Sequence, residues 1–229
     1  AKHFDVMIAL GTHQPMSEPE ICERLEISIE ERKAAYRRVE FINHEWDNPA
    51  ALKEIGTIPA EQIGKLTDGL FAMDVPVEIN RRVFDYDQII IVGPGFPHEV
   101  VGFSGGNKYL FPGVGGADIL NFFHWLGAVV TNMGIIGNSH TPVRAVVDRA
   151  GAMVNVPKKC FALVAKGAGA VGAFAGTPEA ADLTNVAVLA VTSPDGLTTN
   201  NTATTDTEVL TRADVGVTKT GPITATAGQ

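Results

Sequence analysis

The sequence lacks the features that mark disulfide-stabilised, zinc-binding and membrane-spanning proteins. It has two cysteines, Cys22 and Cys160, which are far apart and match no metal-binding spacing. Free thiols are typical of a reducing compartment, so we expect a cytoplasmic protein. No apolar run reaches the ~18–20 residues that cross a membrane. The first residues carry His3 and Asp5, where a secretion signal would be apolar.

Positive charge is also scarce. The chain has 18 Lys and Arg against 26 Asp and Glu, a formal net charge of −8, which argues against general binding of nucleic acids. Its 229 residues, 45% hydrophobic and 19% charged, are enough for a buried core. Residues 184–229 are rich in Thr, Ala, Gly and Val and hold no cluster of candidate catalytic residues. We therefore expect a domain over residues 1–183 and a tail over residues 184–229. Within the tail, residues 186–191 (VAVLAV) have the composition of a strand, and no convincing periodicity is found from Leu197 to Gln229.

The first segment has the pattern of a strand, a loop and a helix. Residues 4–10 (FDVMIAL) are a short apolar run, typical of a buried strand. Ser17 and Glu20 have the spacing of a capping box, which predicts that a helix begins there. His13 lies in the loop between them, at the carboxyl end of the strand, where ligands bind in open α/β sheets. The alternative interpretation of His13 is a loop histidine bonded to the backbone.

A second strand leads to a second histidine. Residues 84–92 (FDYDQIIIV) end in a continuous apolar run, which predicts a central parallel strand buried on both faces. The run leads through residues 93–95 (GPG) to His98. These segments predict an α/β fold: an open, mostly parallel, Rossmann-like sheet with helices on both faces and glycine-rich ligand loops at the carboxyl ends of strands. His13 and His98 could then face one crevice, although a lone histidine is usually structural.

A glycine-rich loop follows the second histidine. Ser104, Gly105, Gly106 and Asn107 precede Lys108, and consecutive backbone N–H groups beside an ammonium group can hold an anion such as a phosphate. The loop lacks the Gly-Lys-Ser/Thr of a P-loop and the G-x-G-x-x-G of a dinucleotide-binding turn. An NAD-dependent dehydrogenase is therefore a weaker hypothesis. For Lys108 taken alone, a solvated loop lysine is the default interpretation.

Two helices are predicted beyond this loop. Residues 118–130 (DILNFFHWLGAVV) contain His124 among apolar residues, so this imidazole is either a hydrogen-bonded core histidine or a metal ligand. Residues 142–153 have the pattern of an amphipathic helix that begins with proline. Its charged residues are expected on the outward side: Arg144, Asp148 and Arg149.

Three segments resemble the N-terminal domain of the lactate racemase family. They are GTHQPMSEPEI (residues 11–21), PHEVVGFSGGNKYLFPG (residues 97–113) and ILNFFH (residues 119–124). The PHxxxGxSGGxK pattern is the specific part, with ten residues from His98 to Lys108 and sixteen from Lys108 to His124. The resemblance runs from about Asp5 to FAGTPEAA (residues 174–181), roughly three quarters of the chain.

The resemblance implies a function and a role for each residue. Family members racemise or epimerise 2-hydroxy acids with a nickel-pincer nucleotide, Ni(II) pyridinium-3,5-bisthiocarboxylic acid mononucleotide. Hydride passes from C2 of the substrate to the cofactor and back, with His13 and His98 as acid and base on opposite faces. Lys108 corresponds to the lysine that holds the cofactor, and His124 to the histidine that binds nickel. The implied partners are a small 2-hydroxy acid and the proteins that synthesise the cofactor.

The chemistry of these residue types agrees with the implied roles. Histidine ionises near neutral pH and is a good nickel ligand when neutral. The loop of Ser104, Gly105 and Gly106 lets the backbone approach a nucleotide closely.

The chain also departs from the family pattern. The family carries an acidic-Thr-Arg motif before the first strand seen here and a C-terminal domain that residues 184–229 do not resemble. Asn107 stands where the family has Arg or Pro. We therefore expect a fragment, for which a nucleotide- or anion-binding domain without turnover is the alternative hypothesis.

Overall fold

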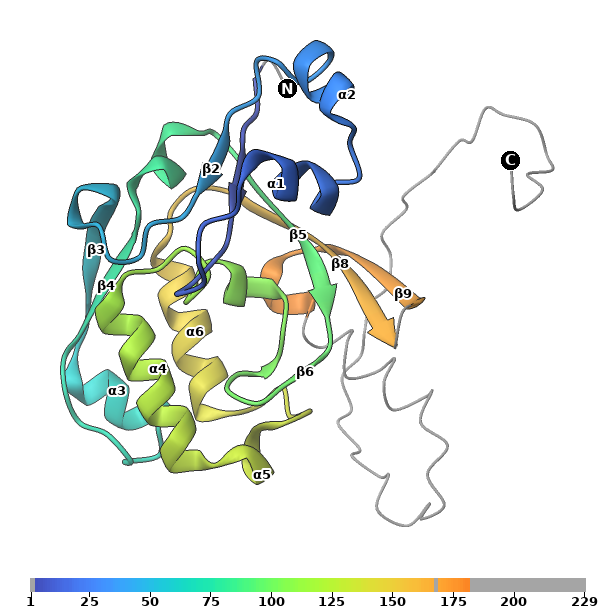
Figure 1. Cartoon of the computed structure of the whole chain (residues 1–229). Coiled ribbons are helices and arrows are strands. Elements are labelled where there is room, and N and C mark those ends of the chain that lie inside the picture. Colours follow the sequence, from blue (N-terminus) through green and yellow to red (C-terminus); the bar gives the residue numbers. More distant parts are fainter. Residues whose placement is uncertain (1–2, 167–168, 182–229) are drawn as a thin grey trace. The chain divides into compact units, whose positions relative to one another are not determined.

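The computed structural model describes residues 3–166 and 169–181 (Figure 1). The chain divides into two compact units, Ala1–Ser193 and Pro194–Gln229. The second unit, like the expected domain boundary after residue 183 and the tail beyond it, lies outside the described residues. Within the described part, no helix has both the length and the apolar character needed to cross a membrane.

The N-terminal segment pairs two short parallel strands and carries two short helices. Its elements are β1 (Val6–Ile8), α1 (Glu18–Arg24), α2 (Ile29–Ala34) and β2 (Phe41–Asn43). Each helix begins with a capping box, formed by Ser17 with Glu20 and by Ser28 with Glu31, in which a serine and a glutamate satisfy N–H groups of the first turn. The predicted strand, loop and helix over the first 25 residues are confirmed, but β1 is half-buried and not buried.

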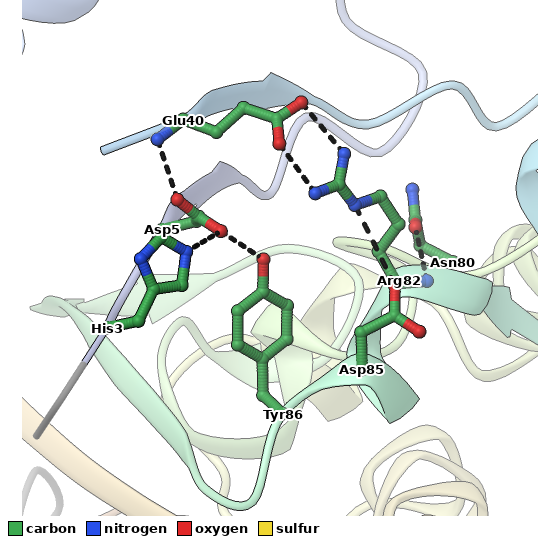
Figure 2. A network of polar contacts seen from close by, with 7 residues as sticks. All are labelled: His3, Asp5, Glu40, Asn80, Arg82, Asp85 and Tyr86. Carbon is green, nitrogen blue, oxygen red and sulfur yellow. Dashed lines mark hydrogen bonds and ion pairs between the residues drawn. The ribbon is translucent and has the colours of Figure 1, made fainter. Parts of the chain in front are cut away.

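Polar contacts connect this segment to residues 82–86, which precede the three-stranded sheet. The Asp5 carboxylate accepts the N–H of Glu40 (2.6 Å) and the hydroxyl of Tyr86 (2.5 Å), as Figure 2 shows. Arg82 donates two hydrogen bonds to Glu40, at 2.8 and 2.6 Å. Arg82 lies in the 3-10 helix η2 (Arg81–Asp85), and Tyr86 directly follows it. These polar contacts hold the N-terminal strands to the rest of the domain together with Met7 and Ala9, which pack against the hydrophobic core.

An antiparallel pair follows. The chain passes through η1 (Pro49–Ala51), β3 (Leu52–Ile58), α3 (Ala60–Leu66) and β4 (Val75–Asn80). β3 and β4 pair antiparallel, with a register shift between Glu54 and Gly56 where Gly56 has φ of 138°. Alternate residues of β4 are buried, which is the pattern of a strand with one face on the core.

The third sheet has three strands. β5 (Ile89–Gly95) pairs parallel with β8 (Lys158–Lys166), which pairs antiparallel with β9 (Gly169–Gly176). A fourth, two-stranded sheet is the small hairpin of β6 (Pro97–His98) and β7 (Gly102–Phe103). The α/β class is confirmed, but the expected single open, mostly parallel, Rossmann-like sheet is not: the described sheets are small and mixed.

The expectation that β5 is buried on both faces is wrong. Ile91 is 5% exposed, but Ile90 and Val92 are 61% and 71% exposed. On the neighbouring strand Phe161 and Leu163 are likewise half-exposed, at 49% and 54%. A continuous apolar run does not reveal whether a strand is covered on one face or on two, because both faces carry apolar residues in either case.

Helices cover the inner side of the sheets. α4 (Ala117–Val130) and α6 (Pro142–Met153) contact each other and lie side by side in Figure 1, and α5 (Asn132–Ile135) follows α4. Both long helices agree with the sequence prediction to within one residue. The core between helices and strands includes buried side chains of β4, β7, β8, α4 and α6 and of the loop before α4: Ile79, Phe103, Phe111, Ile119, Phe123, Leu126, Val146, Val147 and Cys160.

Candidate active site

The β6–β7 hairpin presents His98 at the end of its first strand. His98 pairs with Gly102, which has φ of 86° and closes the turn. The ring folds back over this turn, so that Nδ1 accepts the backbone N–H of Val100 at 3.1 Å. The Glu99 carboxylate lies 3.6 Å from the same nitrogen. The side chain of His98 is 19% exposed and that of Glu99 61% exposed.

The surroundings of His98 favour its neutral form. Burial and the positive charge of Lys108 lower the pKa of His98 to about 4, with smaller contributions from Arg144 and His124. Of the groups that act on His98, only the Glu99 carboxylate raises its pKa. Charged imidazole is disfavoured by desolvation and by nearby cations alike. The ring is therefore neutral at pH 7.

Lys108 lies in η3 (Gly106–Tyr109), the short helical turn of the glycine-rich loop. The turn is entered through Gly105 and Gly106, with φ of 99° and 55°, a backbone region that glycine adopts readily. Burial lowers the pKa of Lys108, and the charge of Arg144 lowers it further. The side chain is half-buried. The default interpretation of a solvated loop lysine therefore does not hold.

Ser104 connects the glycine-rich loop to the end of β5. Its hydroxyl donates to the carbonyl of Pro94 (3.0 Å) and accepts the N–H of Phe96 (3.0 Å). Its own N–H bonds to the carbonyl of Phe96 (2.8 Å). Ser104 is 3% exposed, so this geometry fixes the loop to the strand, and contact of Ser104 with a cofactor stays a prediction.

Asn107 anchors the loop on its other side. It is fully buried, and its amide nitrogen donates to the carboxylates of Asp148 and Glu179, both at 2.9 Å. A Cβ atom at Gly151 would lie 2.6 Å from the Asn107 side chain, so the glycine makes room for it. Burial raises the pKa of Asp148. One neutral amide therefore holds α6 and the segment after β9 against the loop that carries Lys108.

His124 lies on α4, next to the buried Phe122 and Phe123. Its own side chain is exposed, so the interpretation as a core histidine is wrong. Its charge contributes to lowering the pKa of His98, which places the two imidazoles in one electrostatic neighbourhood. An exposed imidazole on a well-packed helix is free to bind a ligand.

His13 lies in the loop after β1. The loop is bonded to the glycine-rich loop, because the N–H of Gly11 donates to the carbonyl of Gly113 at 2.8 Å. The N–H of His13 bonds back to Leu10 at 3.0 Å, while the side chain is exposed. The backbone of the His13 loop is thus adjacent to the loop that carries Lys108, with the imidazole toward solvent.

Two residues of α6 that were expected on its outward side lie inward instead. Asp148 is half-buried and accepts a hydrogen bond from the buried Asn107. Arg144 is 3% exposed and its guanidinium donates to the carbonyl of Phe103. It contributes to lowering the pKa of both His98 and Lys108. Its spacing gave a signal: Arg144 precedes the buried Val147 by three residues and therefore shares its helix face.

The nickel-pincer nucleotide that the resemblance implies needs a ligand for its metal and donors for its phosphate. Among residues 3–166 and 169–181, no three His, Cys, Asp or Glu side chains gather as a metal site. The cofactor brings its own thiocarboxylate donors, so one exposed imidazole such as His124 is a sufficient protein ligand. In the same part of the chain no acceptor takes the N–H of Gly105 or Gly106, which leaves both groups to a phosphate. These residues fit the cofactor.

Comparisons with known proteins identify a family and two similar folds. The model of the lactate racemase N-terminal domain family matches residues 1–134. A crystal structure of a protein from Thermotoga maritima is 31% identical, with a TM-score of 0.67, over 81% of this chain and 45% of its own. The lactate racemase apoprotein from Thermoanaerobacterium thermosaccharolyticum is 22% identical, with a TM-score of 0.64, over 81% of this chain and 40% of its own.

The chain thus spans less than half the length of both solved structures. A comparison with curated proteins gives no match. The family model covers more than half of the 229 residues, and it includes every residue singled out above for catalysis, cofactor binding and nickel. The chain belongs to the lactate racemase N-terminal domain family.

Proposed function

We propose that this chain carries the acid–base and cofactor-holding part of a racemase or epimerase of 2-hydroxy acids, lactate or a relative of it. One observation carries the proposal. His98, Lys108 and His124 belong to three separate elements, yet the charges of Lys108 and His124 both act on the imidazole of His98. Three residue types that such a reaction needs are therefore within electrostatic range of one another, which supports the proposal.

The proposal gives each cofactor residue a role. His124 holds the nickel through its exposed imidazole, and Lys108 holds the nucleotide by an ion pair or a covalent bond. Ser104 keeps the loop in place, and the N–H groups of Gly105 and Gly106 face the phosphate. When bound, the nickel-pincer nucleotide supplies an acceptor for the hydrogen on C2 of the substrate. A lowered pKa makes Lys108 more readily neutral, which favours attack on a carbonyl-type group.

The two histidines act on the substrate hydroxyl. His13 and His98 take the hydroxyl proton from opposite faces and return it after C2 has become planar. The neutral state of His98 at pH 7 supports this role, since a charged imidazole cannot accept a proton. The cytoplasm, where cofactor-synthesis proteins would load the chain, is part of the proposal.

The test is to load the chain with the cofactor and then to measure exchange of the substrate's C2 hydrogen. The chain is co-produced with the cofactor-synthesis proteins, and its nickel content and the exchange of the C2 hydrogen of lactate are measured. His124→Ala is expected to lose nickel, whereas His13→Ala and His98→Ala are expected to keep nickel and lose exchange by roughly 10²-fold or more. His140→Ala, at another exposed histidine, is the matched control. Full exchange in His98→Ala contradicts the acid–base assignment.

A binding domain without turnover is the second candidate. It is favoured by the cationic surroundings of the loop, where Lys108 and Arg144 lie together, and by the coverage of 45% and 40% of the two longer proteins. Binding of a mononucleotide without nickel, abolished in Lys108→Ala and unchanged in Lys33→Ala, with no C2 exchange in the loaded chain, would support this candidate instead.

A further inference from the structure

The ring of His98 has a defined hydrogen-bond geometry at one nitrogen. Nδ1 accepts the N–H of Val100 at 3.1 Å. A nitrogen that accepts an N–H carries no proton itself, and a neutral imidazole has one proton in total. The proton of neutral His98 is therefore on Nε2. In the described part of the chain no protein group bonds to Nε2.

This tautomer is unsuited to acid–base chemistry. A base must receive the substrate proton on a nitrogen with a free lone pair, but Nε2 already carries a proton and Nδ1 faces its own turn. In this state His98 can donate a hydrogen bond to a substrate oxygen, as neutral imidazoles do in other active sites. It cannot accept the hydroxyl proton.

Glu99 offers the alternative partner. Its carboxylate oxygen lies 3.6 Å from Nδ1, and the two atoms make no hydrogen bond because both are acceptors while Nδ1 is unprotonated. If Nδ1 carried the proton, the N–H of Val100 would be repelled and the carboxylate would accept the Nδ1 proton. A carboxylate that accepts from Nδ1 leaves Nε2 with a lone pair, the arrangement by which acidic residues orient catalytic histidines.

We propose that Val100 and Glu99 compete for Nδ1 of His98, and that Glu99 is the positioning residue that turns His98 into a base. With Nδ1 on Val100 the ring donates through Nε2. When Nδ1 carries the proton and donates it in a hydrogen bond to the Glu99 carboxylate, Nε2 takes the hydroxyl proton of the substrate, and the imidazolium that results is balanced by the carboxylate. Solvent exchanges the proton between the nitrogens, because the side chain is 19% exposed. The second half of this inference rests on the proposed function.

Nitrogen NMR tests the competition without cofactor. The full chain is labelled with ¹⁵N-histidine, the ring nitrogens of His98 are assigned with His98→Gln, and the tautomer is read at pH 7. Wild type and Val100→Ala, which keeps the N–H, are expected in the Nε2–H form. Val100→Pro, which lacks the N–H, is expected to change the majority form to Nδ1–H, and Glu99→Ala added to it is expected to reverse most of that change. A wild-type chain mainly in the Nδ1–H form overturns the proposal, even where Val100→Pro does not fold.

Exchange in the loaded chain tests the role of Glu99. Glu99→Ala is expected to keep its nickel and to lose C2 exchange at least about tenfold, with partial recovery in Glu99→Asp. Unchanged exchange in Glu99→Ala overturns the positioning role. If wild type shows no exchange at all, the proposed function fails, whereas the tautomer measured by NMR decides the competition for Nδ1 independently.

Discussion

His98 lies in a buried region of the domain, and His13 lies in an exposed one. The region around His98, from the hairpin through the glycine-rich loop, has buried residues in nearly every position from Val101 to Asn107. The region around His13 is exposed from Thr12 to Pro15, and its strands are held by polar contacts of Asp5 and Glu40. If the two histidines form an acid–base pair, their environments are unequal.

The difference shows in which region the positions of the functional side chains depend on tight packing. Around His98 each backbone turn is fixed by a glycine or by a buried side chain, so a small change of volume is transmitted to the imidazole and to Lys108. Around His13 the exposed side chain is free to adopt its position when a ligand arrives. Substitutions in the buried region are therefore expected to have larger effects than those in the exposed one.

The largest effect is expected at Gly102. A Cβ atom there would lie 1.9 Å from the carbonyl oxygen of Asn138, and φ is +86°. Gly137 has a similar φ of +73° but nothing within 4 Å of its Cβ position. Gly102→Ala is expected to lower the free energy of unfolding by about 3 kcal/mol or more, and Gly137→Ala by about 1 kcal/mol. Urea denaturation measures both, and equal losses would show that the close contact is unimportant.

A smaller loss is expected at Asn107. Asn107→Ala removes the donor that two carboxylates share, on Asp148 and Glu179, and leaves them close together without a partner amide. We expect a loss of about 2 kcal/mol in the free energy of unfolding. Asn121→Ala, on the exposed side of α4, is the control. If Asn107→Ala loses no more stability than Asn121→Ala, the two carboxylates are stabilised by water or by Lys158 in place of the amide.

The pH dependence of stability probes His98. Its pKa is about 4 in the folded chain and about 6.5 when unfolded, so between these values the unfolded chain binds a proton that the folded chain does not. Stability is therefore expected to fall as the pH falls from 6.5 to 4, by about 2 kcal/mol from His98. His98→Gln is expected to show a shallower decline than wild type or His140→Gln in urea denaturation. Parallel curves would contradict the buried, cation-flanked environment.

Local elements were predictable from the sequence, because their signals are local. The helix of residues 142–153 begins at Pro142 as expected, and Ser17 forms the predicted capping box. Strand pairing was less predictable, since it depends on partners far along the chain. A glycine-rich composition alone favours a turn, yet Gly169–Gly176 forms β9, paired with β8 over nearly its full length.

The candidate site divides in the same way. His98 and Lys108 could be selected from the sequence because they lie in one short motif, and His124 because it ends a second segment that resembles the same family; their roles stay predictions. Asn107 could not, because its importance arises from burial against other elements. The helix spacing of Arg144 indicates a buried position, but not which loops it contacts.

The smallest effect is expected in the exposed region. Arg82 pairs with Glu40 through two hydrogen bonds, but the side chains are 35% and 54% exposed. Exposed ion pairs contribute little because water and salt screen them, so Arg82→Gln is expected to change the unfolding midpoint by an amount close to the experimental error. Tyr86→Phe is expected to cost more, since its hydroxyl bonds to Asp5, whose side chain is only 5% exposed. If Arg82→Gln is as damaging as Gly102→Ala, the N-terminal region is not the loosely held half of the site, and the contrast between the two histidines fails.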